Sequence, residues 1–96
     1  MHPAKVKRDQ VRRLTDLPNI GPAMTSDFRL IGINRPDQLV GEDPLRLYQR
    51  LCRVSGVRQD PCVLDTFISV TRFMDGEEPQ PWWSYTKERK HRYGSL

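Results

Sequence analysis

The sequence has few of the residues that build catalytic or metal sites. Its two cysteines, Cys52 and Cys62, are too few for a disulfide framework and lack the neighbours of a zinc site. Its two histidines, His2 and His91, lie in the charged ends, with no nucleophile or carboxylate suitably spaced around them. A glycine-rich phosphate loop is also missing. We therefore predict that the protein is not an enzyme and has no catalytic residue, no metal and no cofactor.

We expect both thiols to be reduced and at least partly buried, because free cysteine is among the most buried residue types. Cys62 falls in the first turn of a predicted helix, and helix N-termini lower the pKa of a thiol. Of the two cysteines, Cys62 is therefore the candidate for reactivity, although the prediction for it is also a reduced, buried thiol.

Long apolar runs are missing as well. Hydrophobic residues make up 36% of the chain and the mean hydropathy is −0.69, which indicates a small core and a large solvated surface. No run approaches the ~20 residues of a membrane span. The first residues carry charges but no apolar region, which argues against a secretory signal. We expect one small cytoplasmic domain of 96 residues that does not contact membranes.

Acidic residues are scarce at the two ends, although the net charge is only +4. Residues 1–13 contain five lysines and arginines against one aspartate, and residues 85–96 contain four against one glutamate. Residues 14–84 contain seven arginines and ten acidic residues, so the middle is mildly acidic. Binding of nucleic-acid phosphates would therefore depend on the ends. Their cations are Lys5, Lys7, Arg8, Arg12, Arg13, Lys87, Arg89, Lys90 and Arg92.

What the sequence does have is a regular alternation of proline and glycine. Proline is favoured at the first position of a helix and glycine just after the last. Segments with this pattern run over 22–32, 36–41, 44–56 and 61–76. Apolar spacing predicts a further helix over Val6–Leu14, and Asp43 and Asp60 are suitable N-caps. No segment alternates as a strand does. We predict an all-α fold of five helices, with the last one, after Pro61, lying centrally.

A sharp turn is predicted at Leu17-Pro18-Asn19-Ile20-Gly21. Asparagine and glycine are the residues that most readily adopt positive φ, so we expect it at Asn19 and Gly21, with Ile20 directed inward. The backbone N–H groups at the start of the following helix would then face outward, where they suit a phosphate.

The C-terminal segment begins with prolines and continues with aromatic residues. Residues 77–81 are too rich in proline for a helix and are expected to be extended. They lead to Trp82, Trp83 and Tyr85 and then to the basic end. Two interpretations stay open for these aromatic residues. They fold back over the core, or they contact a partner by stacking on unpaired bases or anchoring a protein.

The stretch LTDLPNIGPAMTSDFRLIGINRPDQL resembles a helix-hairpin-helix motif with its following connector. With the terminal PWWSYTKERK, nearly the whole chain is similar to a small bacterial pathogenicity-locus family of helix-hairpin-helix proteins, some of which are labelled mitomycin-resistance proteins. The resemblance implies a five-helix, SAM-like fold related to paired helix-hairpin-helix domains, and an association with DNA. We divide the chain into a helix-hairpin-helix domain over 1–76, with its hairpin at 17–22, and a proline-rich, aromatic and basic tail over 77–96. This tail either packs on the domain or extends from it.

The resemblance also implies that hairpin amides hold phosphates without reading sequence. The residues of this hairpin site are Asn19, Ile20, Gly21, Ala23, Met24, Thr25 and Ser26, the last two through their hydroxyls. Three residues oppose the site. Asn19 stands where such hairpins usually have glycine, Pro22 removes one N–H, and Asp27 adds a carboxylate. The alternative is a hairpin that only packs two helices together.

We predict a non-catalytic module that binds DNA without sequence preference through the hairpin amides and the basic ends. The alternative is a protein-interaction adaptor in a DNA-repair or stress-response pathway.

Overall fold

The computed structural model describes residues 1–94, and the regular elements of this part of the chain are all helical, with no strand. It contains four α-helices: α1 (Pro22–Leu30), α2 (Pro44–Ser55), α3 (Pro61–Met74) and α4 (Thr86–Tyr93). Five short 3-10 turns complete it: η1 (Pro3–Lys5), η2 (Arg8–Gln10), η3 (Leu14–Asp16), η4 (Pro36–Leu39) and η5 (Trp82–Tyr85). The predicted all-α class is confirmed. The last two residues of the predicted tail lie outside the described part.

The helix starts follow the proline pattern. Helices α1, α2 and α3 and the 3-10 turn η4 all begin at a proline. Asp43 and Asp60 cap α2 and α3 as predicted, because their carboxylates accept hydrogen bonds from the amides of Leu45 and Cys62. Gly56 ends α2 with φ at 71°, a conformation that costs glycine no steric strain.

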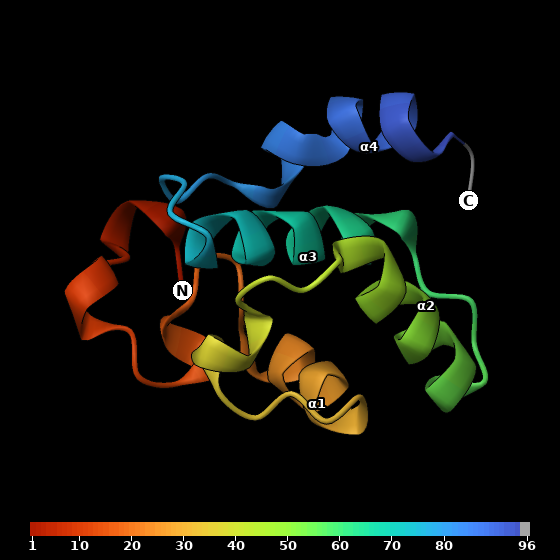
Figure 1. The fold of residues 1–96 in the computed structure, drawn as a ribbon, viewed down its shortest axis with the longest axis horizontal. Helices are drawn as coiled ribbons and strands as arrows, with labels where there is room; N and C mark the ends of the chain where they lie inside the picture. The colour runs from red at the N-terminus through yellow and green to blue at the C-terminus, as the bar shows by residue number, and fades with distance from the viewer. Residues whose placement is uncertain (95–96) are drawn as a thin grey trace.

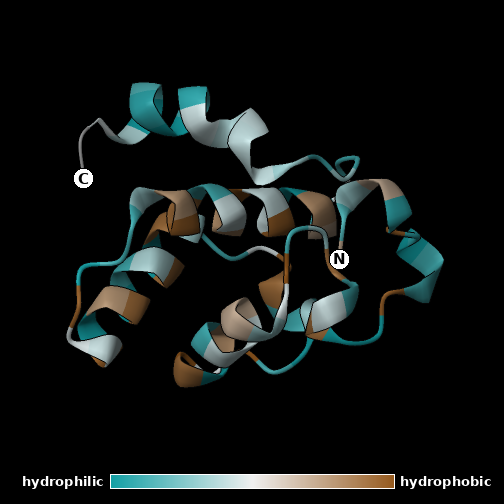
Figure 2. Cartoon of the chain, turned by 180° about the vertical axis from the view of Figure 1, so that it is seen from behind, coloured by the Kyte–Doolittle hydropathy of each residue, from teal (hydrophilic) through white to brown (hydrophobic). Residues whose placement is uncertain are grey.

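Helix α3 is central, as predicted (Figure 1). It lies between α1 on one side and α4 on the other, and α4 runs antiparallel along it. Every residue from Leu64 to Thr71 is buried. The rings of Phe28 in α1 and Phe67 in α3 stack with their centroids 5.0 Å apart. Figure 2 shows apolar residues gathered on α1, α2 and α3, whereas α4 is mostly hydrophilic.

The helix predicted over Val6–Leu14 is not there. The segment instead forms η2 and η3, with extended backbone at Lys7 and Val11. Two of its apolar residues, Val6 and Val11, are five positions apart and so cannot share one face of a helix. Five cations in thirteen residues and β-branched side chains also disfavour a helix.

The C-terminal tail is extended only over residues 77–81. After them, η5 and α4 return along α3, so this part of the tail packs on the domain, and the alternative of a tail that extends from it is wrong. Tyr85, Arg89 and Tyr93 follow one another at four-residue spacing and form the face of α4 and η5 that is turned to the core. Because the middle residue of this stripe is an arginine, the apolar pattern of the helix is hidden in the sequence.

None of the helices in residues 1–94 has both the length and the apolar character required to cross a membrane.

Candidate nucleic-acid interface

The Leu17–Gly21 turn joins η3 to α1. Asn19 has φ at 69° and Ile20 is 1% exposed, and both agree with the sequence-based predictions. The positive φ predicted for Gly21 is wrong. Its backbone is extended, with φ at −114°, and it serves as the N-cap of α1 without a side chain. A Cβ added at Gly21 would have no atom within 4 Å, so the space outside the turn is open.

Asn19 connects the turn to two other parts of the chain. Its side-chain amide donates hydrogen bonds to Ser69 Oγ in α3, at 3.0 Å, and to the main-chain oxygen of Gln80, at 2.8 Å. Its backbone amide donates to the Met1 oxygen at 2.8 Å. The N-terminal amine of Met1 in turn donates to the Leu17 and Ile20 oxygens, and desolvation lowers its pKa. An asparagine at this position therefore has a structural role that glycine cannot fill.

The first turn of α1 leaves backbone donors available. Pro22 has no N–H, and the amide of Thr25 donates to the Gly21 oxygen. Within the residues that the structure describes, the amides of Gly21, Ala23 and Met24 have no hydrogen-bond acceptor. Such groups at a helix N-terminus suit an anion.

Other members of the predicted hairpin site are already engaged. The amide of Ile20 donates to the Leu17 oxygen at 3.4 Å. The hydroxyls of Thr25 and Ser26 donate to the oxygens of Gly21 and Pro22, four residues earlier. Since a hydroxyl has a single proton to donate, neither is a free donor for a phosphate in this geometry. Asp27 is half-buried, and this burial raises the pKa of its carboxyl.

Three arginines surround a hollow beside the turn. We call it the arginine hollow; it has a volume of about 270 Å³ and lies between the N-terminal segment and α1. It is lined by Arg12, Arg13, Leu14, Thr15, Thr25, Arg29 and Asn34. Within residues 1–94 none of its three guanidinium groups takes part in an ion pair. A neighbouring hollow shares Arg12 and adds Arg8 and Arg35.

One carboxylate lies close to this hollow. Asp16 accepts hydrogen bonds from the backbone amides of Arg12 and Arg13, at 2.9 and 2.8 Å. These two bonds, more than the nearby charge of Arg13, lower the pKa of Asp16. The carboxylate is thus held by main-chain donors, which leaves the arginine side chains directed elsewhere.

Arg29 and Arg35 belong to none of the sites predicted from the sequence. Both belong to the acidic middle of the chain, and only the fold brings them to the basic N-terminal segment. The one local signal is the four-residue spacing that sets Arg29 on the same face of α1 as Thr25.

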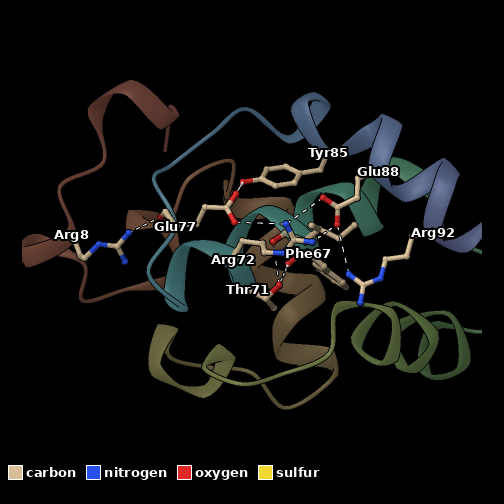
Figure 3. Close-up of polar contacts among 9 residues, drawn as sticks. Arg8, Phe67, Thr71, Arg72, Glu77, Tyr85, Glu88 and Arg92 are labelled. Atoms are coloured by element: carbon tan, nitrogen blue, oxygen red, sulfur yellow. Dashed lines mark hydrogen bonds and ion pairs between the residues drawn. The ribbon is translucent and has the colours of Figure 1, made fainter.

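Two of the predicted phosphate-binding cations are occupied within the fold. The Arg8 guanidinium donates to the main-chain oxygen of Glu77 (Figure 3). It also donates to the main-chain oxygen of Phe73 and lies 4.0 Å from the centroid of the Phe73 ring. Arg89 is 9% exposed and pairs with the fully buried Asp65, Nε to Oδ1, at 2.8 Å. Neither side chain is available to a ligand in this geometry.

The remaining cations form two separate groups. Lys5 and Lys7 are exposed on the N-terminal segment. Lys87, Lys90 and Arg92 are exposed on α4, where Arg92 lies 3.7 Å from Glu88. The C-terminal end of α4 is at the opposite end of the molecule from the N-terminal segment (Figure 1). The two basic ends therefore do not converge on the turn.

A second concave surface lies on the other side of the turn. We call it the aromatic groove; it has a volume of about 380 Å³. It is lined by Met1, His2, Pro3, Asn19, Ile20, Gly21, Pro81, Trp82 and Trp83. Trp83 is 62% exposed, while Trp82 is half-buried and meets it edge to face, with ring centroids 5.6 Å apart.

Tyr85, the third predicted aromatic contact, is a core residue. It is buried, and its hydroxyl donates to Glu77 Oε1 at 2.8 Å (Figure 3). Burial, followed by this contact with Glu77, raises the pKa of Tyr85. Tyr85 is therefore folded onto the core and Trp83 faces solvent, and contact of Trp83 with a partner stays a prediction.

The pKa predicted for Cys62 is wrong in direction. Burial of the thiol, together with the nearby Asp60 carboxylate, raises the pKa of Cys62 to about 11. The Asp60 carboxylate, which caps the same helix, thus adds to the effect of burial in disfavouring the thiolate. Residues 1–94 contain no cluster of three histidines, cysteines or carboxylates that could hold a metal ion.

Comparison with known proteins identifies the class. A family model described as Cdd1, pathogenicity locus, matches residues 7–91, so the chain belongs to that family. Among its relatives is a protein named Mitomycin resistance protein McrB, from Streptomyces lavendulae. The two are 44% identical over 77 residues, which cover 80% of this chain and 73% of that protein. No solved structure matches the chain.

Proposed function

We propose that this protein is a non-catalytic helix-hairpin-helix module that binds the phosphate backbone of DNA without sequence preference in the bacterial cytoplasm. The Leu17–Gly21 turn is the hairpin of that motif. The observation that carries the proposal is the set of free amides at Gly21, Ala23 and Met24 beside the arginine hollow. Thr25, which lines the hollow, directly follows Met24. Main-chain donors and unpaired arginines together suit a chain of phosphates.

The proposed contact set differs from the one expected from sequence. It keeps the three amides, Arg12 and Arg13, and adds Arg29. The exposed Lys5 and Lys7 extend the same basic segment. Arg8 is left out because its guanidinium bonds two main-chain oxygens and packs on the Phe73 ring, and Arg89 because it is buried against Asp65. The exposed Arg12 makes a single hydrogen bond, to the Val11 oxygen, and is kept. The cations of α4 contribute to the overall field only, since they lie across α3 from the hairpin.

A salt titration tests this proposal. Five contacting cations predict that log affinity falls with log salt with a slope of about −4. Non-specific binding of this kind has Kd values of about 1–100 μM near physiological salt. Two duplexes of unrelated sequence should bind equally well, since phosphate contacts carry no sequence information. Absence of binding to either duplex at ~50 mM salt would contradict the proposal.

The second candidate is a protein-interaction adaptor in a DNA-repair or stress-response pathway. It is favoured by two exposed apolar side chains, Trp83 and Val57, which is 60% exposed. The name of the relative, which refers to mitomycin resistance, supports a stress-response setting for either candidate. The adaptor becomes the preferred function if the low-salt titration gives no DNA binding.

A further inference from the structure

We propose that the aromatic groove binds one unpaired nucleotide of DNA, with the base stacked on Trp83 and the adjoining phosphate at the hairpin amides. This inference rests on the proposed DNA-binding function and extends it. It predicts that the protein binds DNA with single-stranded ends, gaps or junctions more tightly than an uninterrupted duplex.

The shape of the groove suits a nucleotide. Its volume of about 380 Å³ lies in the range of small-ligand sites. One wall is the Pro81–Trp83 segment and the other is the hairpin, which supplies Gly21 and its free amide. A base against the first wall therefore places its backbone beside the amides proposed to hold phosphate.

The aromatic wall is exposed but well supported. Trp82 packs against Trp83 at an interplanar angle of 85°, so the half-buried ring braces the exposed one. The Asn19 side chain holds the main chain at Gln80, and its backbone holds Met1, so the hairpin is tied to both neighbouring segments of the groove. A site formed before binding loses less conformational entropy when a ligand enters.

Charge also favours a nucleotide. The residues that line the groove include no carboxylate, and Lys5 follows two residues after Pro3. A paired base cannot reach such a site because it is stacked inside the duplex, whereas an unpaired base can. Stacking on an aromatic side chain accepts any base, which agrees with binding that has no sequence preference.

The test compares a blunt duplex with the same duplex carrying a short single-stranded extension. We expect the extension to increase affinity about 5- to 150-fold, the range expected for stacking of one base. Tryptophan emission should change on binding the extended DNA. Trp82 and Trp83 are the only tryptophans of the chain and both line the groove, so this signal reports its occupancy.

Variants assign the effect to the groove. Trp83→Ala should abolish the preference for the extension and leave blunt-duplex affinity unchanged, because the exposed side chain contributes little to the core. Trp83→Phe should retain most of the preference. Val57→Ala is the matched control: it removes an equally exposed apolar side chain outside the groove and should change neither affinity.

Three results would overturn the inference. Equal affinity for the two DNAs would do so while leaving the proposed function intact. If Trp83→Ala still binds the extended DNA more tightly than the blunt duplex, another surface binds the extension. That result would also overturn the inference and leave the proposed function intact. Failure to bind either DNA at ~50 mM salt would overturn both proposals together.

Discussion

The side chain of Asn19 donates a hydrogen bond to the main-chain oxygen of Gln80 across 61 residues of sequence. The same nitrogen donates to Ser69 Oγ, so one amide joins the hairpin, α3 and the segment that leads to the tryptophans. This position combines a left-handed backbone with two side-chain contacts. Asparagine is the residue that provides both.

Substitutions at Asn19 should separate these two roles. Asn19→Gly keeps the positive φ and loses both hydrogen bonds, so the free energy of unfolding should fall by about 1–2 kcal/mol. Asn19→Ala loses the same hydrogen bonds and, unlike the glycine variant, keeps a Cβ in the left-handed region, so it should be about 1 kcal/mol less stable than Asn19→Gly. Urea denaturation measures both values. Equal stability of the two variants would show that the backbone conformation contributes nothing.

Two triple variants with the same change of charge test which cations meet DNA. The first triple variant removes the three positive charges that line the arginine hollow. It combines Arg12→Gln, Arg13→Gln and Arg29→Gln. It should make the salt slope shallower by about 3, since each phosphate contact contributes about one. Lys87→Gln with Lys90→Gln and Arg92→Gln removes three charges from α4 and should leave the slope nearly unchanged. A larger effect of the α4 triple would place the interface on the other side of α3.

The ion pair between Asp65 and Arg89 should dominate the docking of α4. Asp65 also accepts a hydrogen bond from the Thr86 hydroxyl at 2.7 Å. Asp65→Asn leaves the buried guanidinium without a counter-charge and should lower the free energy of unfolding by about 3 kcal/mol. Adding Arg89→Met should recover part of this loss, because no unpaired charge then stays buried.

The control for the Asp65 and Arg89 substitutions is Arg92→Gln, which breaks an exposed ion pair with Glu88 on the same helix. Exposed pairs contribute little, so the change should stay within about 0.5 kcal/mol. Urea denaturation of the wild-type protein, the single variants Asp65→Asn and Arg89→Met and their double variant measures the coupling. A double variant as unstable as the sum of both single changes would contradict the pairing.

The raised pKa of Cys62 predicts a slow thiol. In a Cys52→Ser background, alkylation by iodoacetamide should stay slow at neutral pH and accelerate only as the pH nears about 11. Because folding raises this pKa, the folded protein holds the proton more tightly than the unfolded chain. This difference in pKa contributes to the free energy of unfolding. The contribution is fully present below the ordinary thiol pKa and is lost as the pH rises through about 11. Half-maximal alkylation below the ordinary thiol pKa would contradict the assignment.

Some segments of this structure could be predicted from the sequence and others could not. Helices α1, α2 and α3 were predictable because proline, glycine and aspartate act locally at helix ends. Helix α4 was not, because its inward face includes Arg89, and only the buried Asp65, 24 residues earlier, makes that burial favourable. The N-terminal segment failed for the opposite reason. Its apolar spacing suggested a helix, but the segment is held by distant acceptors, since Arg8 donates to main-chain oxygens in α3 and just beyond it.

The candidate site divides in the same way. The hairpin was recognisable because its turn residues are consecutive. The arginine hollow was not, since Arg29 joins Arg12 and Arg13 only through packing of α1 on the N-terminal segment. The mildly acidic average of the middle of the chain concealed an arginine that the fold exposes on a basic surface.

The contacts of Arg8 also determine the order in which the chain acquires its structure. Its acceptors, Phe73 and Glu77, lie 65 and 69 residues further along. Closing loops of this length costs entropy that the few contacts of the N-terminal segment cannot offset alone. We therefore expect the basic N-terminal segment to become ordered only after α3 has formed.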